Sequence, residues 1–353
     1  MSTGTAIEWT EATWNPTTGC DRVSPGCDNC YALTLAKRLK AMGSAHYQTD
    51  GDPRTSGPGF GLATHDDALD LPLRWRKPRR VFVNSMSDLF HKDVSNEFIA
   101  RVFAVMALTP QHTYQVLTKR HARMRSLLRS ADFGDLLEHA VTAIAGNGPD
   151  ADAWHWSWPL LNVWLGVSVE DQHWADIRIP ALLDTPAAVR WISAEPLLGP
   201  VDLNPYLWLT GPSTAGPFYD HAGRRRGGGG VGGQTFTSVP ARDLQWVVTG
   251  GESGPGSRPM RPEWALSLRD QCSAAGVAFF HKQWGEWGHL DHLPEATFMD
   301  LDVAHGASLW AAFPDGMVRV GKKRAGRLLD GRTHDEYPDA SRQWPEGEAT
   351  GDA

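Results

Sequence analysis

Short apolar runs rich in β-branched residues recur along the chain, and each ends in a cluster of small or polar residues. Continuous runs of this kind predict strands that are buried on both faces. Segments with helical periodicity lie between them, and alternating strands and helices predict a parallel sheet. The predicted strands are VFVNSMSD (81–88), YQVLTKR (114–120), NVWLGVSVE (162–170), VRWISAEP (189–196), WVVTGGESG (246–254) and VAFFHKQWG (277–285).

The helical segments complete the repeat. The last of them has Pro262 near its start and Gly276 at its end, as helix termini prefer. With one more strand just before residue 19, the chain has six or seven βα units, which predicts an α/β fold with a partial or full (β/α) barrel. The predicted helices cover 31–43, 96–109, 121–130, 177–185 and 262–276.

The expected barrel spans residues 1–285 and is interrupted by insertions. Residues 286–341 have no clear βα pattern, and we expect them to pack on the barrel as a C-terminal extension. Residues 342–353 are expected to be a disordered tail. The insertions, expected to be loops or a lid, are 43–72 (rich in Gly, Pro and Asp), 132–158 (ending in AWHWSW) and 204–243 (containing RRRGGGGVGG).

Composition narrows the class of protein. A chain of 353 residues that is 41% hydrophobic can bury a large core, and no apolar run reaches the ~18 residues of a membrane helix. Low cysteine use fits a reducing cytoplasm. The net charge of −7 gives no overall attraction to nucleic acid, although basic residues cluster at 74–80 and 224–226. Sixteen tryptophans provide aromatic surface for core packing or for base stacking.

Three of the four cysteines fall in GCDRVSPGCDNCYA (19–32), with six and then two residues between them. A disulfide framework requires a small secreted chain, so these thiols indicate a metal site. Three thiolates can hold three irons of a [4Fe-4S] cluster and leave the fourth iron open. Zinc is the alternative, but it normally takes four protein ligands, and Cys272 and His46 are remote in sequence. Ligand number and type favour the cluster. The candidate ligands are Cys20, Cys27 and Cys30.

Polar residues and glycines directly follow the predicted strands, where parallel α/β folds place ligands. One such residue is equally well explained as a helix N-cap, but five clusters in succession favour a shared site. His281, Lys282 and Gln283 end the last strand and are candidates for substrate contact, whereas Cys272 is expected to be a small buried hydrophobe. The five clusters are Ser85, Ser87 and Asp88; Thr118 and Lys119; Ser168 and Glu170; Ser193 and Glu195; Gly250, Gly251, Glu252 and Ser253.

These motifs, in order over about residues 5–338, resemble an uncharacterised phage and bacterial family known for a three-cysteine motif and regarded as related to radical S-adenosylmethionine enzymes. Most enzymes of that class space their cysteines three and then two apart, with an aromatic residue just before the last; here Tyr31 follows the last cysteine instead. The segments that carry the resemblance are GCDRVSPGCDNCYA, FVNSMSDLFH, VLTKR, VWLGVSVEDQ, RWISAEPLLGPV, WVVTGGESGPGSRP, FFHKQWGEW and GRLLDGR.

The resemblance implies a [4Fe-4S] cluster and S-adenosylmethionine as cofactors, and an electron donor such as a flavodoxin or ferredoxin. In that class, S-adenosylmethionine binds the open iron and is cleaved to a 5′-deoxyadenosyl radical that abstracts hydrogen from the substrate. By position, Ser85 to Asp88 would face its amino group, Lys119 its carboxylate, and Ser168 and Glu170 its ribose. Glu195 and the loop that holds Gly250, Gly251 and Glu252 would serve the adenine or the substrate, and Tyr31 would line the cofactor site.

A nucleic acid or nucleobase is the favoured substrate, for modification or repair. Basic loops and tryptophan clusters are expected beside the site, and a DNA repair enzyme, spore photoproduct lyase, belongs to the same broad class. One alternative is a non-enzymatic nucleic-acid-binding module in which iron–sulfur or zinc only staples the loop. Another is a barrel without a cluster that acts as a nucleotide-binding or hydrolytic protein. The need for a separately encoded partner protein stays open.

Overall fold

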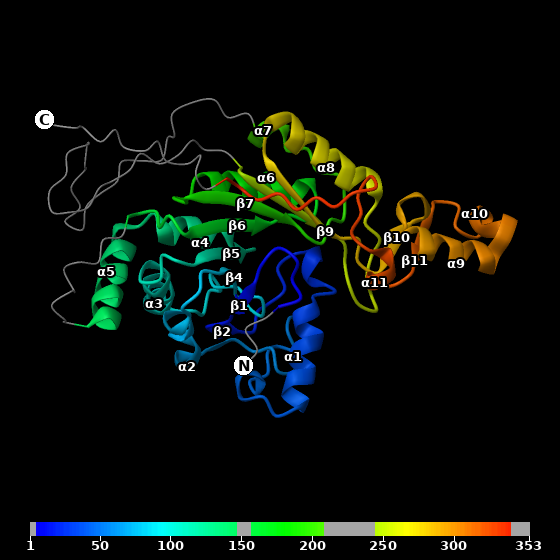
Figure 1. The fold of residues 1–353 in the computed structure, drawn as a ribbon. Coiled ribbons are helices and arrows are strands. Elements are labelled where there is room, and N and C mark those ends of the chain that lie inside the picture. The colour runs from blue at the N-terminus through cyan, green and yellow to red at the C-terminus, as the bar shows by residue number, and fades with distance from the viewer. Residues whose placement is uncertain (1–4, 147–156, 208–243, 340–353) are drawn as a thin grey trace, which may run out of the picture.

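The computed structural model describes residues 5–146, 157–207 and 244–339. Its centre is a parallel sheet of seven strands, which stand side by side in the order in which they occur along the chain (Figure 1). All six quoted strand segments and the strand expected before the cysteines are confirmed. The strands are β1 (Ala12–Trp14), β4 (Arg80–Val83), β5 (Thr113–Thr118), β6 (Val163–Ser168), β7 (Val189–Ala194), β8 (Trp246–Gly250) and β9 (Ala278–Gln283).

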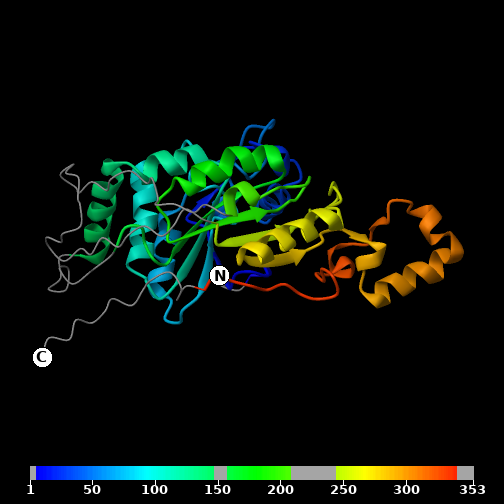
Figure 2. The ribbon, with the colours of Figure 1, turned by 90° about the horizontal axis from the view of Figure 1, so that it is seen from above.

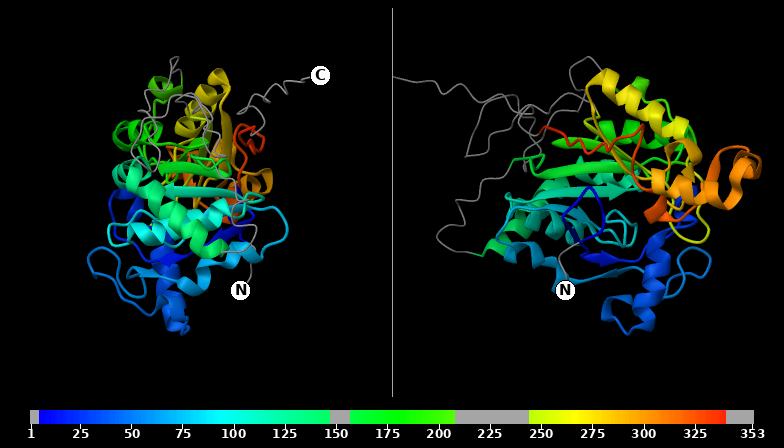
Figure 3. Two further views of the ribbon diagram at one scale, coloured as in Figure 1. Left: turned by 90° about the vertical axis from the view of Figure 1, so that its left-hand side faces the viewer. Right: turned by 45° about the vertical axis from the view of Figure 1, so that its right-hand side comes forward.

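The sheet is curled, and helices flank its convex side (Figure 3). Its two edge strands, β1 and β9, do not pair with each other among the described strands, so the structure is a partial barrel and not a closed one. The predicted helices are confirmed within a few residues at each end. The helices beside the sheet are α1 (Tyr31–Ala41), α3 (Asn96–Ala107), α4 (His121–Leu128), α5 (Ala131–Ala145), α6 (Gln172–Leu183), α7 (Asn204–Leu207) and α8 (Pro262–Ala275).

An aromatic cluster fills the N-terminal half of the concave face. Trp9, which precedes β1, contacts Trp191 in β7 with ring centroids 5.3 Å apart, although β7 lies four places from β1 in the sheet. Such a contact requires a strongly curled sheet. Trp164 and Trp246 join the same buried cluster. Because these four indoles are buried in the core, they are not available for base stacking.

Gly166 in β6 makes room for this cluster, since a β-carbon there would lie 2.4 Å from Cε2 of Trp191. We expect Gly166→Ala to lower the free energy of unfolding by about 1–3 kcal/mol, because overpacking forces the indole out of its position. The matched control is Gly134→Ala in α5, where an added β-carbon meets nothing within 4 Å. That variant should be neutral or stabilising by up to about 1 kcal/mol. Urea unfolding compares the two; equal stabilities would contradict the packing argument.

Two of the expected insertions contain regular structure. Residues 132–158 were expected to be a loop or lid, but most of the described part is α5, which packs against α3. Residues 43–72 form short elements beside the cysteine segment: η2 (Ala45–Tyr47), β3 (Ala63–Thr64), α2 (Asp66–Leu69) and part of η3 (Leu71–Arg74). Strand β3 pairs with β2 (Thr17–Thr18), which leads into the cysteine loop. Most of the 204–243 insertion, and the whole 342–353 tail, lie outside the described residues.

The C-terminal extension forms a small unit beyond β9 and then returns to the sheet (Figure 2). It has its own apolar cluster, centred on Leu290, Leu309 and Val318. The returning segment lies along β9, where the His281 amide donates to the His334 carbonyl oxygen at 2.9 Å. The elements of the extension are β10 (Trp287–His289), η5 (Leu290–His292), α9 (Glu295–His305), η6 (Gly306–Ser308), α10 (Leu309–Ala312), β11 (Met317–Arg319) and α11 (Lys322–Ala325). No helix in the described part of the chain is long and apolar enough to span a membrane.

Candidate functional site

The loop with Cys20, Cys27 and Cys30 lies at the carboxyl end of the parallel strands. The loop begins beside β4, where the Gly19 amide donates to the Met86 carbonyl oxygen at 3.0 Å. It ends at Cys30, the N-cap residue of α1. All three cysteines are free and half-buried. The thiols are therefore held in one ordered loop at the edge of the sheet where such folds carry chemistry.

Three side chains of this segment fasten it to the ends of three strands. The Ser24 hydroxyl donates to Oε1 of Glu170, after β6, at 2.7 Å. Tyr31 Oη donates to the carbonyl oxygen of Ser85, after β4, at 2.5 Å. Asn29 Nδ2 donates to Oε2 of a carboxylate after β8, Glu252, at 3.0 Å. The loop thus extends across the mouth of the partial barrel.

Glu170 is the most deeply buried of these anchors, with a side chain that has no exposed surface. Arg178 Nη1, also fully buried, donates to its Oε2 at 2.9 Å, and Lys119 forms an ion pair with its Oε1. Burial alone would raise the pKa of Glu170, but the charges of Lys119 and Arg178 outweigh burial and lower it. Gly26 packs closely against the ion pair of Glu170 and Lys119, and a β-carbon at Gly26 would lie 2.5 Å from Cγ of Glu170. Glu170 therefore holds the cysteine loop, and both of its carboxylate oxygens already accept hydrogen bonds from protein groups.

Glu252 is a second buried carboxylate that holds the cysteine loop in place. The amide and Nε of Arg258 donate to its Oε2 at 2.7 and 3.0 Å, in addition to Asn29. Burial would raise the pKa of Glu252, but the hydrogen bonds from Arg258 lower it. Arg258 Nη2 also donates to the carbonyl oxygen of Pro25 at 2.8 Å. This arginine thereby connects the end of β8 to the cysteine loop.

Asp88 and Lys119, both candidate cofactor contacts, are tied into the framework. Asp88 accepts hydrogen bonds from the Thr118 hydroxyl at 2.7 Å, the Lys119 amide at 2.9 Å and the Phe90 amide at 3.0 Å. Its carboxylate thus links the ends of β4 and β5 beside Cys20. The Lys119 ammonium already neutralises Glu170. The structure gives both residues a positioning role.

The surroundings of the thiols disfavour free thiolates. Burial raises the pKa of Cys20 to about 12, and the Asp88 carboxylate adds to the effect while Arg120 opposes it. Burial also raises the pKa of Cys30. Such thiols stay protonated at neutral pH unless a metal replaces their protons.

The spacing of the sulfurs bears on the kind of metal. Thiolate ligands of one tetrahedral zinc ion lie about 3.8 Å apart, given a Zn–S distance of about 2.3 Å. The three cysteine sulfurs do not all lie within 4.8 Å of one another. Among the described residues, the only group of three or more His, Cys, Asp and Glu ligand atoms that does so comes from two histidines and an aspartate. The three thiols thus share one loop but do not form one compact group of ligand atoms in this structure.

Other predicted residues at the mouth differ in how far they are exposed. Glu195 forms an ion pair with Lys282, and both side chains keep some exposure, 20% and 11%. Ser168 is buried, and its Oγ donates weakly to the Glu195 carbonyl oxygen at 3.4 Å, whereas half of the Tyr31 surface is exposed. Ser85 Oγ donates to Oδ1 of Asn15 at 3.2 Å. These residues lie at the carboxyl ends of the strands, beside the cysteine loop, or, in the case of Tyr31, at the start of the helix that follows it.

Several predictions at the mouth need correction. His281 and Gln283 were candidates for substrate contact, but strand alternation turns them away from Lys282. His281 Nδ1 lies 3.0 Å from the Thr249 hydroxyl, and burial lowers its pKa to about 3. Gly250 and Gly251 are buried and bonded through their backbones, to Leu197 and Gln283. These contacts use the carbonyl oxygen of Gly250 and the amide of Gly251, so neither of these two groups is free to bind a cofactor.

The basic segment at 74–80 lies at the opposite end of the sheet from the cysteines, because Arg80 begins β4. Arg79 stacks on Trp75 and Arg80 on Tyr337, with distances of 5.5 and 4.1 Å to the ring centroids. The idea of a basic loop beside the site is therefore wrong for this segment. Arg224 to Arg226 lie outside the described residues.

Comparison with protein families adds one finding to this geometry. The family model described as "Protein of unknown function (DUF5131)" matches residues 4–338. The chain belongs to the DUF5131 family. No curated protein and no solved structure matches the chain significantly. The DUF5131 match includes the cysteine loop, every strand of the sheet and the C-terminal extension, so the site lies wholly within the family's shared region.

Four residues of this DUF5131 site were missed by the sequence analysis. Ser24 and Asn29 belong to the cysteine loop, but their partners, Glu170 and Glu252, are more than a hundred residues away. Arg178 lies in α6, eight residues after Glu170, and no helical spacing pairs the two residues because Glu170 precedes the helix. The fourth is Arg258, six residues after Glu252, and no spacing rule pairs these two residues either.

Proposed function

We propose that this protein is a radical S-adenosylmethionine-type enzyme in which Cys20, Cys27 and Cys30 hold a [4Fe-4S] cluster. One observation carries the proposal: three half-buried thiols in a single loop are fastened across the carboxyl ends of β4, β6 and β8. When bound, such a cluster supplies the electron that breaks a carbon–sulfur bond of S-adenosylmethionine. The family resemblance of the motifs supports the same reading.

In this proposal the polar residues of the mouth have two kinds of role. Glu170, Glu252 and Asp88 are positioning residues, because their carboxylates hold the loop and the strand ends. Glu195 with Lys282, and the exposed part of the Tyr31 side chain, are left to bind S-adenosylmethionine or the substrate. The tryptophan cluster closes the floor of the half-barrel, which keeps water from reaching the mouth through the sheet.

The substrate class proposed is a nucleic acid or nucleobase, modified or repaired by hydrogen abstraction. Support at the mouth comes from partly exposed arginines of the loop region, Arg22 and Arg258, with side-chain exposures of 42% and 35%. Both are partly neutralised by Asp28, so any phosphate contact would compete with that ion pair. A flavodoxin or ferredoxin would supply the electron, and a reducing cytoplasm is the compartment that suits these thiols.

A cleavage assay tests the proposal. Protein reconstituted anaerobically with iron and sulfide, then reduced, should convert S-adenosylmethionine to methionine and 5′-deoxyadenosine. Protein that carries a full cluster but neither binds nor cleaves S-adenosylmethionine would overturn it and favour the alternative, a nucleic-acid-binding module with a structural cluster or zinc. Salt-dependent binding to DNA or RNA, measured on the same preparation, separates that module from a protein with no nucleic-acid partner.

A further inference from the structure

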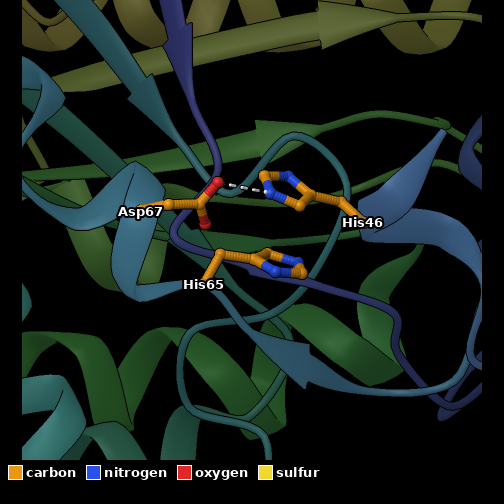
Figure 4. Close-up of side chains that lie close together, drawn as sticks. All are labelled: His46, His65 and Asp67. Atoms are coloured by element: carbon orange, nitrogen blue, oxygen red, sulfur yellow. Dashed lines mark hydrogen bonds and ion pairs between the residues drawn. The ribbon is translucent and has the colours of Figure 1, made fainter.

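Two histidines and an aspartate, residue types that can ligate metals, lie close together beside β2 (Figure 4). His46 comes from η2, while His65 and Asp67 lie at the start of α2, and one ligand atom from each falls within 4.8 Å of the other two. His46 Nε2 and Asp67 Oδ2 are 3.0 Å apart. The two imidazole rings stack, with centroids 3.9 Å apart and planes inclined by 14°.

The buried hydroxyl of Thr18 fixes the tautomer of His65. Thr18 Oγ1 has one hydrogen, which it donates to the His46 carbonyl oxygen at 3.0 Å. It must therefore accept from His65 Nε2, 2.8 Å away, so that nitrogen carries the proton. Nδ1 of His65 then has a free lone pair. A second-shell partner that holds one ring nitrogen protonated and leaves the other basic is what metal-bound histidines usually have.

The rest of the group is suited to accept an ion. Burial lowers the pKa of His65, and neighbouring His46 adds to this effect, which keeps the ring neutral as a ligand. The Asp67 carboxylate is 68% exposed and can turn toward an ion, and His46 keeps 22% exposure. Lone pairs of stacked rings run side by side and do not converge. Metal binding therefore requires the His46 ring, the more exposed of the two, to rotate out of the stack.

We propose that His46, His65 and Asp67 form a site for one divalent cation of the zinc class, separate from the cysteines. Two imidazole nitrogens and one carboxylate are a donor set that suits zinc, with a fourth position left to water. The ion would cross-link η2 with the start of α2 inside the 43–72 segment. The hydrogen bonds of Thr18, two residues before Cys20, to His65 and to the His46 carbonyl oxygen would connect this ion-bound segment to the entrance of the cysteine loop. The inference does not depend on the proposed function.

The test uses full-length protein in which Cys20, Cys27 and Cys30 are all alanine, so that thiols cannot bind the ion. Equilibrium dialysis against Zn²⁺, followed by elemental analysis, should find about one ion per chain. Asp67→Asn should weaken binding by at least about tenfold, and Thr18→Val, which removes the tautomer-fixing contact, by about 10–100-fold. The matched control is Asp66→Asn, since Asp66 is equally exposed but pairs with Arg101.

A second measurement avoids reliance on the triple variant. Wild-type protein titrated with Co²⁺ should show ligand-field absorption bands from this site. These bands should lack thiolate-to-cobalt charge transfer because the site contains no cysteine, and Asp67→Asn should remove them. The proposal is overturned if neither preparation binds a stoichiometric ion at this site, or if Asp67→Asn and Asp66→Asn bind equally well. Asp67 is exposed, so loss of binding in that variant cannot be ascribed to unfolding; circular dichroism verifies this.

Discussion

Replacing Cys20, Cys27 and Cys30 one at a time with alanine is expected to abolish cleavage of S-adenosylmethionine. Each substitution leaves two thiolates, too few to hold three irons, so iron content after reconstitution should fall from about four per chain to less than about one-tenth of that. Iron and sulfide analysis measures the first effect, and chromatography of 5′-deoxyadenosine measures the second.

The matched control for these variants is Cys272→Ala. Cys272 is fully buried in α8, as the sequence suggested, and burial raises its pKa well above the usual range. Alanine there removes a small buried atom and should leave iron content and cleavage unchanged. Cleavage that survived in a cysteine-loop variant would remove the cluster from the mechanism and favour the barrel that acts without one.

Glu170→Ala is expected to lower the free energy of unfolding by about 3–5 kcal/mol. The substitution leaves the buried guanidinium of Arg178 without its carboxylate, and an uncompensated buried charge is costly. It also frees Ser24, so the cysteine loop loses its anchor on β6. Denaturant unfolding of the apo protein measures stability, and the iron content of the reconstituted variant reports on the loop.

A double variant separates these two effects. Glu170→Ala with Arg178→Met removes both buried charges and should recover part of the lost stability, but not the anchoring of the loop. The wild-type carboxyl has a folded-state pKa below its unfolded value of about 4.3, so its stabilisation is present above that pH. It is lost as the pH falls through the folded pKa. Glu170→Ala should therefore flatten the acid side of the stability curve; an unchanged slope would contradict the assignment.

The parallel strands were predictable because both of their faces are buried. Segments such as β6, with every residue buried, produce a continuous apolar run that no other element of this length explains. The curl of the sheet was harder to predict from the sequence, because it depends on the packing of Trp9 against Trp191, whose strand lies four places from β1 in the sheet. Helix α5 was missed because its segment was assigned to one insertion together with the Trp-rich AWHWSW stretch.

The site was predicted in position but not in role. Cys20, Cys27 and Cys30 stand out by residue type and spacing alone, and strand-end polarity identified Glu170 and Glu252. What these carboxylates do depends on partners from distant segments that no local pattern indicates. The histidine group beside β2 was invisible for the same reason, because it forms only when the 43–72 segment folds back onto Thr18.

The most direct test of the central claim is electron paramagnetic resonance of anaerobically reconstituted, reduced protein, recorded with and without S-adenosylmethionine. The account predicts the signal of a four-iron cluster that shifts when S-adenosylmethionine is added, because one iron has no protein ligand. A cluster signal that does not change, or tightly held zinc at Cys20, Cys27 and Cys30 in its place, would contradict it.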